Sequence, residues 1–435
     1  MQRTRYLALL ALIATLGACG REEPAPAVTG ADGSAMNTIA EQYVRLTLSV
    51  GEHDPDYVDA YYGPPEWRPE GEKQNLDDLV TRAASLAGDL RRIQAPDDEM
   101  ERLRFEYLKA QVNAMNARLR MLKGERLSFD EESKALYDAV APAHPETYFE
   151  TILQDLESHF PGSGPLVERY DAWRRGFVIP REKLDAVFRT AIEACRERTA
   201  AHLQLPPDES FTVEYVTNKS WSGYNWYQGG FRSLIQVNTD LPIYIDRAVD
   251  LACHEGYPGH HVYNVLLERN LVRDRGWMEF TVYPLFSPQS LIAEGTANYG
   301  IEVAFPGEQR IAFEEQTLFP AAGLDPAKAR EYYAVQALVE RLSYAGNEAA
   351  RRYLNGEIDA DAAAAWLQKY ALMPRERAQQ RVRFFDQYRS YVINYNLGKD
   401  MVRTFIEARA DKDPQKRWEE FGRLLSSPRL PSGLD

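Results

Sequence analysis

Residues 254–261 read HEGYPGHH, and this segment constrains the fold more than any other part of the chain. Three of the seven histidines of the protein fall within these eight residues, and a glutamate follows the first of them. In the zinc signature H-E-x-x-H, two histidines one helical turn apart bind the metal, and the glutamate polarises a water molecule. Here Pro258 occupies the position of the second histidine, so a regular helix cannot form that site.

Helix geometry shows what must change if these histidines are to bind one metal ion. On a straight helix, His254 would lie about 9 Å along the axis from His260 and about 10.5 Å from His261, whereas Zn–N bonds are about 2.1 Å long. Pro258 removes a helix hydrogen bond and clashes with the carbonyl four residues earlier, and the glycines beside it loosen the backbone. We therefore predict a helix distorted across residues 256–259.

The size of that distortion decides which histidine is the second ligand. A bulge of two residues would bring His260 to the metal, and a bulge of three would bring His261. We favour His260 because it needs the smaller insertion. The competing interpretation is that the histidines only cap a broken helix or project from it without a function. A Pro-Gly break does not explain, however, why histidines stand on both sides of it.

A zinc site with two histidines needs a third protein ligand and an open position for water. Residues 287–300 read SPQSLIAEGTANYG, and Ser287 and Pro288 suit the start of a helix. Glu294 stands in a small and apolar stretch of this helix, where a carboxylate needs a partner or a metal. We predict Glu294 as the third ligand, with Glu302 two turns later as the alternative.

These residues and two later motifs resemble the bacterial domain-of-unknown-function 885 family. The family pattern reads H-E-x-x-P-G-H-H, then E-G-W-A-L-Y, then Y-x-x-G, and this chain has HEGYPGHH, EGTANY (294–299) and YNLG (395–398). The family looks related to gluzincin metallopeptidases such as carboxypeptidase Taq and thimet oligopeptidase. The resemblance implies zinc peptidase chemistry and an elongated helical fold with a deep cleft.

The expected roles follow from that chemistry. With zinc on His254, His260 and Glu294, Glu255 would take a proton from the attacking water and pass it to the leaving amine. The tetrahedral oxyanion needs a further donor. The resemblance to helical gluzincins implies Tyr395 for this role, and Tyr391 is the second choice.

The pattern of apolar residues predicts a mainly α protein with a small β-sheet beside the metal site. Helical spacing dominates a helical N-terminal part, residues 38–205, and the metal-site part spans residues 206–435. Alternation in residues 211–216 and 233–238 predicts two strands. The second could be an edge strand that pairs with an extended peptide, so that Arg232 could meet a substrate carboxylate.

Two neighbouring segments complete this expectation. Residues 220–231, SWSGYNWYQGGF, indicate a loop rich in glycine and aromatic residues, which could line the cleft. Residues 240–242 can start a long helix that carries the HEGYPGHH segment, because proline is tolerated in a first helical turn. The two cysteines of the main domain, Cys195 and Cys253, are expected to be buried free thiols, with one disulfide as the alternative.

The N-terminus indicates export. A short basic region and an apolar run too short to span a bilayer end in Leu16-Gly17-Ala18-Cys19, which resembles a lipobox. We predict a signal peptide at 1–18, a lipid on Cys19 and a flexible tether over 19–37, with the protein on the outer membrane facing the periplasm. The net charge of -14 argues against nucleic acid as a partner.

The sequence therefore predicts a Zn2+-dependent metallopeptidase that hydrolyses peptide bonds in the cell envelope. The alternatives are a metal-dependent hydrolase of other amides or esters and a catalytically silent binding lipoprotein. A silent protein has no need of a general base, and Glu255 supplies one.

Overall fold

The computed structural model describes residues 35–434. The predicted signal peptide, the lipid on Cys19 and nearly all of the predicted tether lie outside this range; the first helix begins at Ala35. Helices make up 66% of the described residues and strands 8%, so the prediction of a mainly α protein with a small β-sheet is confirmed. No helix in the described range is long and apolar enough to cross a membrane.

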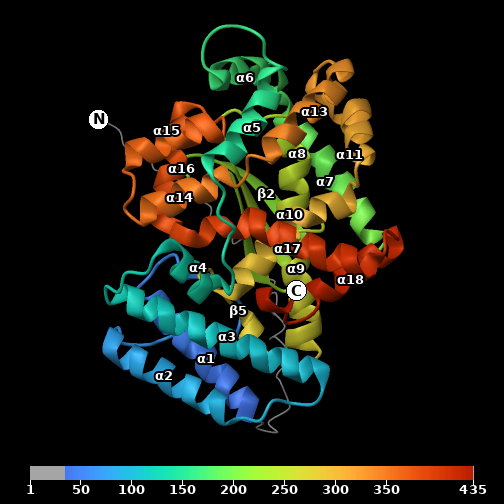
Figure 1. The fold of residues 1–435 in the computed structure, drawn as a ribbon. Coiled ribbons are helices and arrows are strands. Elements are labelled where there is room, and N and C mark those ends of the chain that lie inside the picture. Colours follow the sequence, from blue (N-terminus) through green and yellow to red (C-terminus); the bar gives the residue numbers. More distant parts are fainter. Residues whose placement is uncertain (1–34, 435) are drawn as a thin grey trace, which may run out of the picture.

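The helices of the first half form one end of the molecule and part of the opposite end (Figure 1). Helices α1 to α3 stack together at the lower end in that view, and α5 and α6 lie at the upper end. These helices are α1 (Ala35–Gly51), α2 (Leu76–Arg92), α3 (Glu99–Leu122), α4 (Phe129–Tyr137), α5 (Glu146–Glu157), α6 (Leu166–Arg174) and α7 (Leu184–Ala200).

The helices of the second half surround a central pair, α10 and α17, which pack closely together (Figure 1). Helices α14 to α16 lie on one side of this pair, and α11 and α13 lie toward the upper end. These helices are α8 (Asp246–Leu251), α9 (His260–Leu267), α10 (Pro288–Ala304), α11 (Glu308–Phe313), α12 (Phe319–Ala322), α13 (Ala329–Glu340), α14 (Ala345–Leu354), α15 (Ala360–Tyr370), α16 (Arg375–Tyr388), α17 (Ile393–Ala410) and α18 (Pro414–Leu425).

The larger sheet has the strand order β2-β4-β3, in which β2 (Ser210–Val216) is parallel and β3 (Gly223–Gly229) antiparallel to β4 (Arg232–Asn238). Both predicted strands are present. The prediction of an edge strand at 233–238 was wrong, because β4 is central and hydrogen-bonds to a neighbour on each side. A substrate peptide therefore has no free edge on β4 to pair with, and Arg232 is exposed at its start.

The predicted loop at 220–231 was also wrong, because it contains β3. Its side chains alternate between the two faces: Asn225 and Tyr227 are buried, whereas Trp226 and Gln228 are exposed. A smaller antiparallel sheet pairs β1 (Val58–Tyr61) with β5 (Val282–Pro284). This sheet ties the N-terminal helices to the segment that leads into α10.

The helix expected from 240–242 begins later, at Asp246. The carboxylate of Asp240 instead accepts hydrogen bonds from the backbone N–H groups of Asn218 and Lys219, at 2.8 and 3.2 Å, and so closes the loop before β3. The expectation of free thiols is likewise corrected, because Cys195 on α7 and Cys253 form a disulfide with Cα atoms 5.7 Å apart. This bond attaches α7 to the residue that precedes His254.

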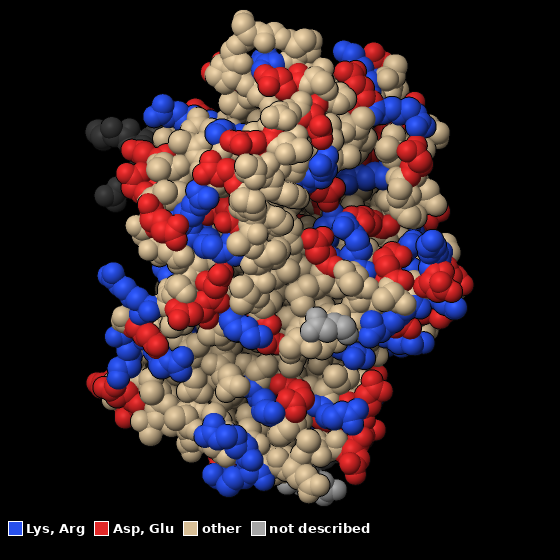
Figure 2. Space-filling model, in the orientation of Figure 1, with Lys and Arg blue, Asp and Glu red and all other residues tan. Residues whose placement is uncertain are grey.

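Charges of both signs are interspersed over the face shown in Figure 2, where blue and red side chains lie among tan ones. No continuous basic surface is visible on that face. Such mixed surfaces are ordinary for a globular protein and do not by themselves indicate a partner.

Candidate metal centre

The helix that carries the HEGYPGHH segment is interrupted where the sequence predicts. Residues Ala252–Gly256 form a wide π-type turn, the Tyr257–Pro258 peptide bond is cis, and a new helix begins at His260. Gly259 is indispensable to this path, because a Cβ atom there would lie 1.8 Å from the carbonyl oxygen of His254. The interruption gives the two ends of the segment a geometry that a straight helix could not.

Three predicted site residues meet across this interruption. The Nε2 atoms of His254 and His260 are 3.1 Å apart. The Oε2 atom of Glu294, which projects from α10, lies 3.3 Å from Nε2 of His254 and 3.8 Å from Nε2 of His260. Their side chains are only 13%, 14% and 7% exposed. Two imidazoles and a carboxylate therefore share one nearly buried point.

The surroundings of Glu294 fit a cation. Its Oε1 atom accepts a hydrogen bond from the hydroxyl of Tyr391 at 2.8 Å, whereas its buried Oε2 atom has no hydrogen-bond partner. Leaving a buried carboxylate oxygen unpartnered is costly unless a cation neutralises it. Ligand atoms around a tetrahedral zinc ion with bonds of 2.0–2.1 Å are about 3.3 Å apart. The three separations in this cluster are close to that value.

Glu255 adds a second carboxylate to the cluster. One donor atom from each of His254, Glu255 and His260 can be chosen so that all three lie within 4.8 Å of one another. Glu255 thus competes with Glu294 as third ligand, but Glu294 places its free oxygen directly opposite both imidazoles. Burial and the charge of Glu294 raise the pKa of Glu255 to about 7, although His254 opposes the shift. Glu255 can therefore exchange a proton near neutral pH.

Strand β3 covers Glu255. The Asn225 side chain donates a hydrogen bond to the backbone carbonyl of Glu255 at 2.7 Å. A Cβ atom on Gly223 would lie 2.7 Å from the carboxylate of Glu255, so the backbone of β3 passes directly over it. The small sheet thus lies beside the cluster and fixes the position of this acid.

His261 points away from the cluster. Its ring is fully buried, its Nδ1 atom lies 2.9 Å from the hydroxyl of Ser233, and its Nε2 atom lies 2.9 Å from Oε2 of Glu209. The same carboxylate accepts a hydrogen bond from Tyr257 at 2.6 Å and pairs with Arg196 at 2.9 Å. Both ring nitrogens of His261 are therefore occupied, and neither is directed at Glu294.

Glu302, the alternative third ligand, also lies outside the cluster. Its carboxylate pairs with Lys399 at 2.8 Å and with Arg403, both on α17. Ser287 precedes the first residue of α10 as expected, but its hydroxyl binds the carbonyl of Pro284 at 2.7 Å and does not cap the helix.

The two candidate tyrosines differ in what they contact. The hydroxyl of Tyr391 donates its hydrogen bond to Glu294, as described above. The hydroxyl of Tyr395 makes no hydrogen bond to any described residue. The ring centroids of the two tyrosines are 5.8 Å apart. Burial and the charge of Glu294 raise the pKa of Tyr395 well above its ordinary value, so its hydroxyl keeps its proton and can donate it to a hydrogen bond.

A close contact between α10 and α17 brings Glu294 and these tyrosines together. Gly295 of the EGTANY motif faces Gly398 of the YNLG motif. A Cβ atom on Gly295 would lie 2.5 Å from the carbonyl oxygen of Gly398, and one on Gly398 would lie 2.7 Å from that of Leu291. The two motifs thus meet at a point where only glycine fits.

Three residues of the site were missed by the sequence analysis. Asp59 on β1 accepts a hydrogen bond from Tyr224, and burial together with the charges of Glu294 and Glu255 raises its pKa to about 8. Arg377 and Arg381 on α16 lie beside neighbours of the cluster, because Arg381 lies over the ring of Tyr395 and Arg377 hydrogen-bonds to Ser222 next to β3. Nothing near Asp59 in the sequence marks it among 65 acidic residues. The two arginines stand in RERAQQRVR, which looks like an ordinary solvated helix face.

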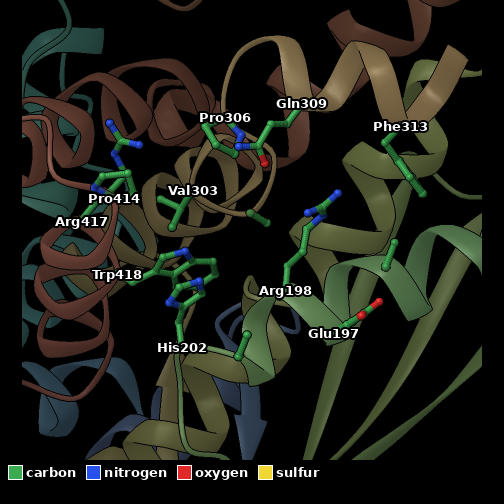
Figure 3. Close-up of a pocket in the computed structure, with 13 residues that line it drawn as sticks. Glu197, Arg198, His202, Val303, Pro306, Gln309, Phe313, Pro414, Arg417 and Trp418 are labelled. Carbon is green, nitrogen blue, oxygen red and sulfur yellow. The ribbon is translucent and has the colours of Figure 1, made fainter. Parts of the chain in front are cut away.

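A separate cavity of about 520 Å³ lies between α7, the end of α10, α11 and α18 (Figure 3). His202 stacks on Trp418 at one wall, with ring centroids 4.8 Å apart, and Arg198 projects from another. None of the residues that line this cavity belongs to the His–Glu cluster. The chemistry of the site described above therefore does not extend to it.

No protein-family model matches the chain, and no curated protein sequence matches it. Among solved structures, a protein described as a lipoprotein from Colwellia psychrerythraea is similar, with 16% identity and a TM-score of 0.48 over 85% of this chain and 69% of that one. Another, described as a lipoprotein of unknown function from Shewanella oneidensis, has 14% identity and a TM-score of 0.44 over 82% of this chain and 72% of that one. The resemblance to the domain-of-unknown-function 885 family stays a prediction.

Proposed function

We propose that this chain is a zinc-dependent metallopeptidase of the cell envelope, anchored by a lipid on Cys19. The observation that carries the proposal is the convergence of the Nε2 atoms of His254 and His260 on the buried Oε2 atom of Glu294, which accepts no hydrogen bond. Two imidazoles and one carboxylate are the ligand set of thermolysin-like catalytic zinc sites, which keep a fourth position open.

The residues around the cluster have complementary roles in this proposal. A bound zinc ion would polarise the scissile carbonyl and make water acidic enough to react near neutral pH. Glu255 accepts a proton from the attacking water and delivers it to the leaving nitrogen. Tyr395 donates a hydrogen bond to the carbonyl oxygen as negative charge develops there. Tyr391 and Asn225 hold Glu294 and Glu255 in position.

The decisive experiment measures metal content and hydrolysis in the same preparations. Wild-type protein is expected to contain one zinc per chain and to cleave members of a peptide library. Glu255→Gln should keep the metal and lose about 10²- to 10⁴-fold in kcat. Glu294→Gln should lose the metal, whereas Glu302→Gln on the same helix should keep both metal and activity.

The other outcomes separate the alternatives. Stoichiometric zinc without peptide cleavage, but with Glu255-dependent hydrolysis of another amide or an ester, favours a non-peptidase hydrolase. Protein that binds no metal after incubation with zinc would be the silent lipoprotein, and the enzymatic proposal would be wrong. Loss of metal in Glu255→Gln but not in Glu294→Gln would exchange the roles of these two carboxylates.

A further inference from the structure

Arg377 and Arg381 border the metal centre without an acidic partner. They are one turn apart on α16, so they lie on the same face of that helix. The guanidinium of Arg381 lies 5.6 Å from the ring centroid of Tyr395 and 4.5 Å from that of Phe384. Its Nε atom is buried without an acceptor, and the side chain makes no hydrogen bond to any described residue.

Arg377 contacts only neutral oxygens. It donates hydrogen bonds to the side-chain oxygen of Gln380 at 2.7 Å and to the hydroxyl of Ser222 at 3.0 Å. Ser222 directly precedes Gly223, whose backbone covers the carboxylate of Glu255. Arg377 therefore approaches the cluster from the side of β3, and Arg381 approaches it from the side of Tyr395.

Two buried arginines elsewhere in the protein show the usual pairing. Arg104 forms two hydrogen bonds with the carboxylate of Glu279, at 2.6 and 3.1 Å, and Arg351 pairs with Glu348. In the described chain, no carboxylate lies within 4.0 Å of the guanidinium of Arg377 or Arg381. An arginine that is mostly removed from water normally has such a partner.

The electrostatics around the metal centre leave these two charges uncompensated. Burial, and then the charge of Arg381, lowers the pKa of Arg377 to about 10. Burial also lowers the pKa of Arg381, although Tyr395 and Glu294 oppose the shift. A divalent cation in the cluster would be balanced by the carboxylates of Glu294 and Glu255. The two guanidinium groups would then remain as excess positive charge beside the place where substrate must lie.

We propose that Arg377 and Arg381 form a carboxylate-binding subsite, so that the preferred substrate is a peptide with a carboxylate close to the scissile bond. Guanidinium groups bind carboxylates through paired, charge-assisted hydrogen bonds. The carboxylate can be the C-terminus of the peptide or an acidic side chain, because the recognising chemistry is the same. This inference rests on the proposed function, since it names the substrate of the same site.

Binding to an inactive variant tests the subsite without requiring turnover. Full-length Glu255→Gln protein is titrated with one fluorescently labelled neutral peptide in three forms: free C-terminal acid, C-terminal amide, and amide with one internal glutamate. We expect the free acid or the glutamate peptide to bind about tenfold more tightly than the neutral amide, as a charged hydrogen-bonded pair predicts. Free-acid preference identifies the C-terminus, and glutamate preference identifies an acidic side chain.

Variants of α16 connect that preference to the two arginines. Arg381→Met on the Glu255→Gln background should abolish the preference, and Arg381→Lys should keep part of it. Arg383→Met is the matched control, because Arg383 is exposed on the same helix. Arg377→Gln provides a second variant if Arg381→Met unfolds at a lower temperature, since the partners of Arg377 are neutral.

The results can separate a failure of the arginine subsite from a failure of the proposed peptidase activity. Equal binding of all three peptides, or a preference that survives both Arg381→Met and Arg377→Gln, would overturn the subsite even if the wild type cleaves peptides. A preference that depends on the arginines, in a protein that cleaves none of the peptides, would uphold the subsite and count against the proposed peptidase. With an active enzyme, the arginine variants should raise KM for the preferred peptide far more than they lower kcat.

Discussion

At the scale of single residues, two adjacent histidines with the same chemistry have opposite surroundings. His260 faces His254 and the free oxygen of Glu294, whereas both ring nitrogens of His261 are held by Ser233 and Glu209. The sequence indicates His260 only through the size of the bulge that each histidine would need. The hydrogen bonds of His261 come from strand β4 and from the residue before β2, and no local pattern shows them.

Alanine at each position should therefore have a different effect. His260→Ala is expected to remove the bound zinc and leave the thermal unfolding of the metal-free protein nearly unchanged. His261→Ala should keep the zinc but lower the free energy of unfolding by about 1–3 kcal/mol, because Glu209 and Ser233 lose a buried partner. Zinc analysis and thermal unfolding with and without a chelator measure both effects. Loss of zinc from a folded His261→Ala protein, with zinc kept by His260→Ala, would reverse the assignment.

Glu209 also gives the fold a pH dependence that can be measured. Burial opposes its charge, but hydrogen bonds from His261, Tyr257 and Arg196 outweigh that effect and lower its pKa to about 2. A carboxyl whose pKa is lower in the folded state stabilises the fold above its unfolded pKa of about 4.5, and this stabilisation is lost as the pH falls toward 2.

The expected result is a difference in unfolding free energy between the wild type and Glu209→Gln, a stability gap that becomes smaller in acid. At pH 6, Glu209→Gln should unfold with a free energy lower than the wild type by on the order of 2 kcal/mol. At pH 3 the gap should be clearly smaller, since the wild type has then lost most of the same contribution. Urea unfolding at a series of pH values checks this, with Glu214→Gln, on the exposed surface of β2, as the control. A gap that widens toward pH 3 would contradict the lowered pKa.

At the scale of elements, the sequence predicted those features that local chemistry determines. Alternation identified β2 and β4, and Pro258 with its glycines identified the break before His260. The sequence pattern did not identify β3. The glycines and aromatic residues in 220–231 obscure the alternation of buried and exposed side chains, which becomes clear only once the strand is paired in the sheet. α8 starts later than predicted for a similar reason. The carboxylate of Asp240 accepts a hydrogen bond from Asn218, in a loop much earlier in the sequence.

The contact between α10 and α17 explains why the EGTANY and YNLG motifs each contain a glycine. Glu294 on α10 and Tyr391, two residues before α17, meet where these helices approach at Gly295 and Gly398, and any side chain at either glycine would strike backbone. Sequence alone shows two small residues about a hundred positions apart and gives no sign that they touch. A methyl group at either position must push the helices apart and so separate Glu294 from its tyrosine.

Gly295→Ala and Gly398→Ala are therefore expected to reduce both stability and zinc affinity. Overpacking of this kind costs about 1–3 kcal/mol, and the displaced Glu294 should weaken zinc binding as well. Gly346→Ala is the matched control, because it is also a buried helical glycine but a Cβ atom there meets nothing within 4 Å. The control should be neutral or stabilising by up to about 1 kcal/mol. If all three variants behave alike in urea unfolding and zinc titration, the close contact does not position the site.

At the scale of the whole molecule, the site is assembled from segments that lie far apart along the chain. Asp59 comes from the smaller sheet, the imidazoles from the interrupted helix, Glu294 from α10, and the arginines and tyrosines from residues 377–395. The interrupted turn is the least regular of these parts, and it is attached to the rest on two sides. Tyr257 binds Glu209 on one side, and the Cys195–Cys253 disulfide attaches the turn to α7 on the other.

The disulfide leads to a prediction about the entire domain. It closes a loop with a sequence separation of 58 residues, and disulfides that close loops of this size stabilise proteins by about 2–4 kcal/mol. Such bonds persist in oxidising compartments, which agrees with the export that the N-terminus predicts. We expect mild reduction to lower the Tm of the wild type, while Cys195→Ala has the lower Tm with or without reductant.

The zinc content of Cys195→Ala should stay close to that of the wild type at 25 °C, because the substitution leaves all ligands in place and the Tyr257–Glu209 hydrogen bond still holds the turn. Cys195 is the better position to change, since Cys253 directly precedes His254. Thiol alkylation followed by mass spectrometry should find Cys195 and Cys253 of the oxidised wild type unmodified. If both react without reductant, or if reductant leaves the Tm of the wild type unchanged, the bond does not stabilise the domain. Loss of zinc from a folded Cys195→Ala protein would instead show that the disulfide, more than Glu209, sets the geometry of the imidazoles.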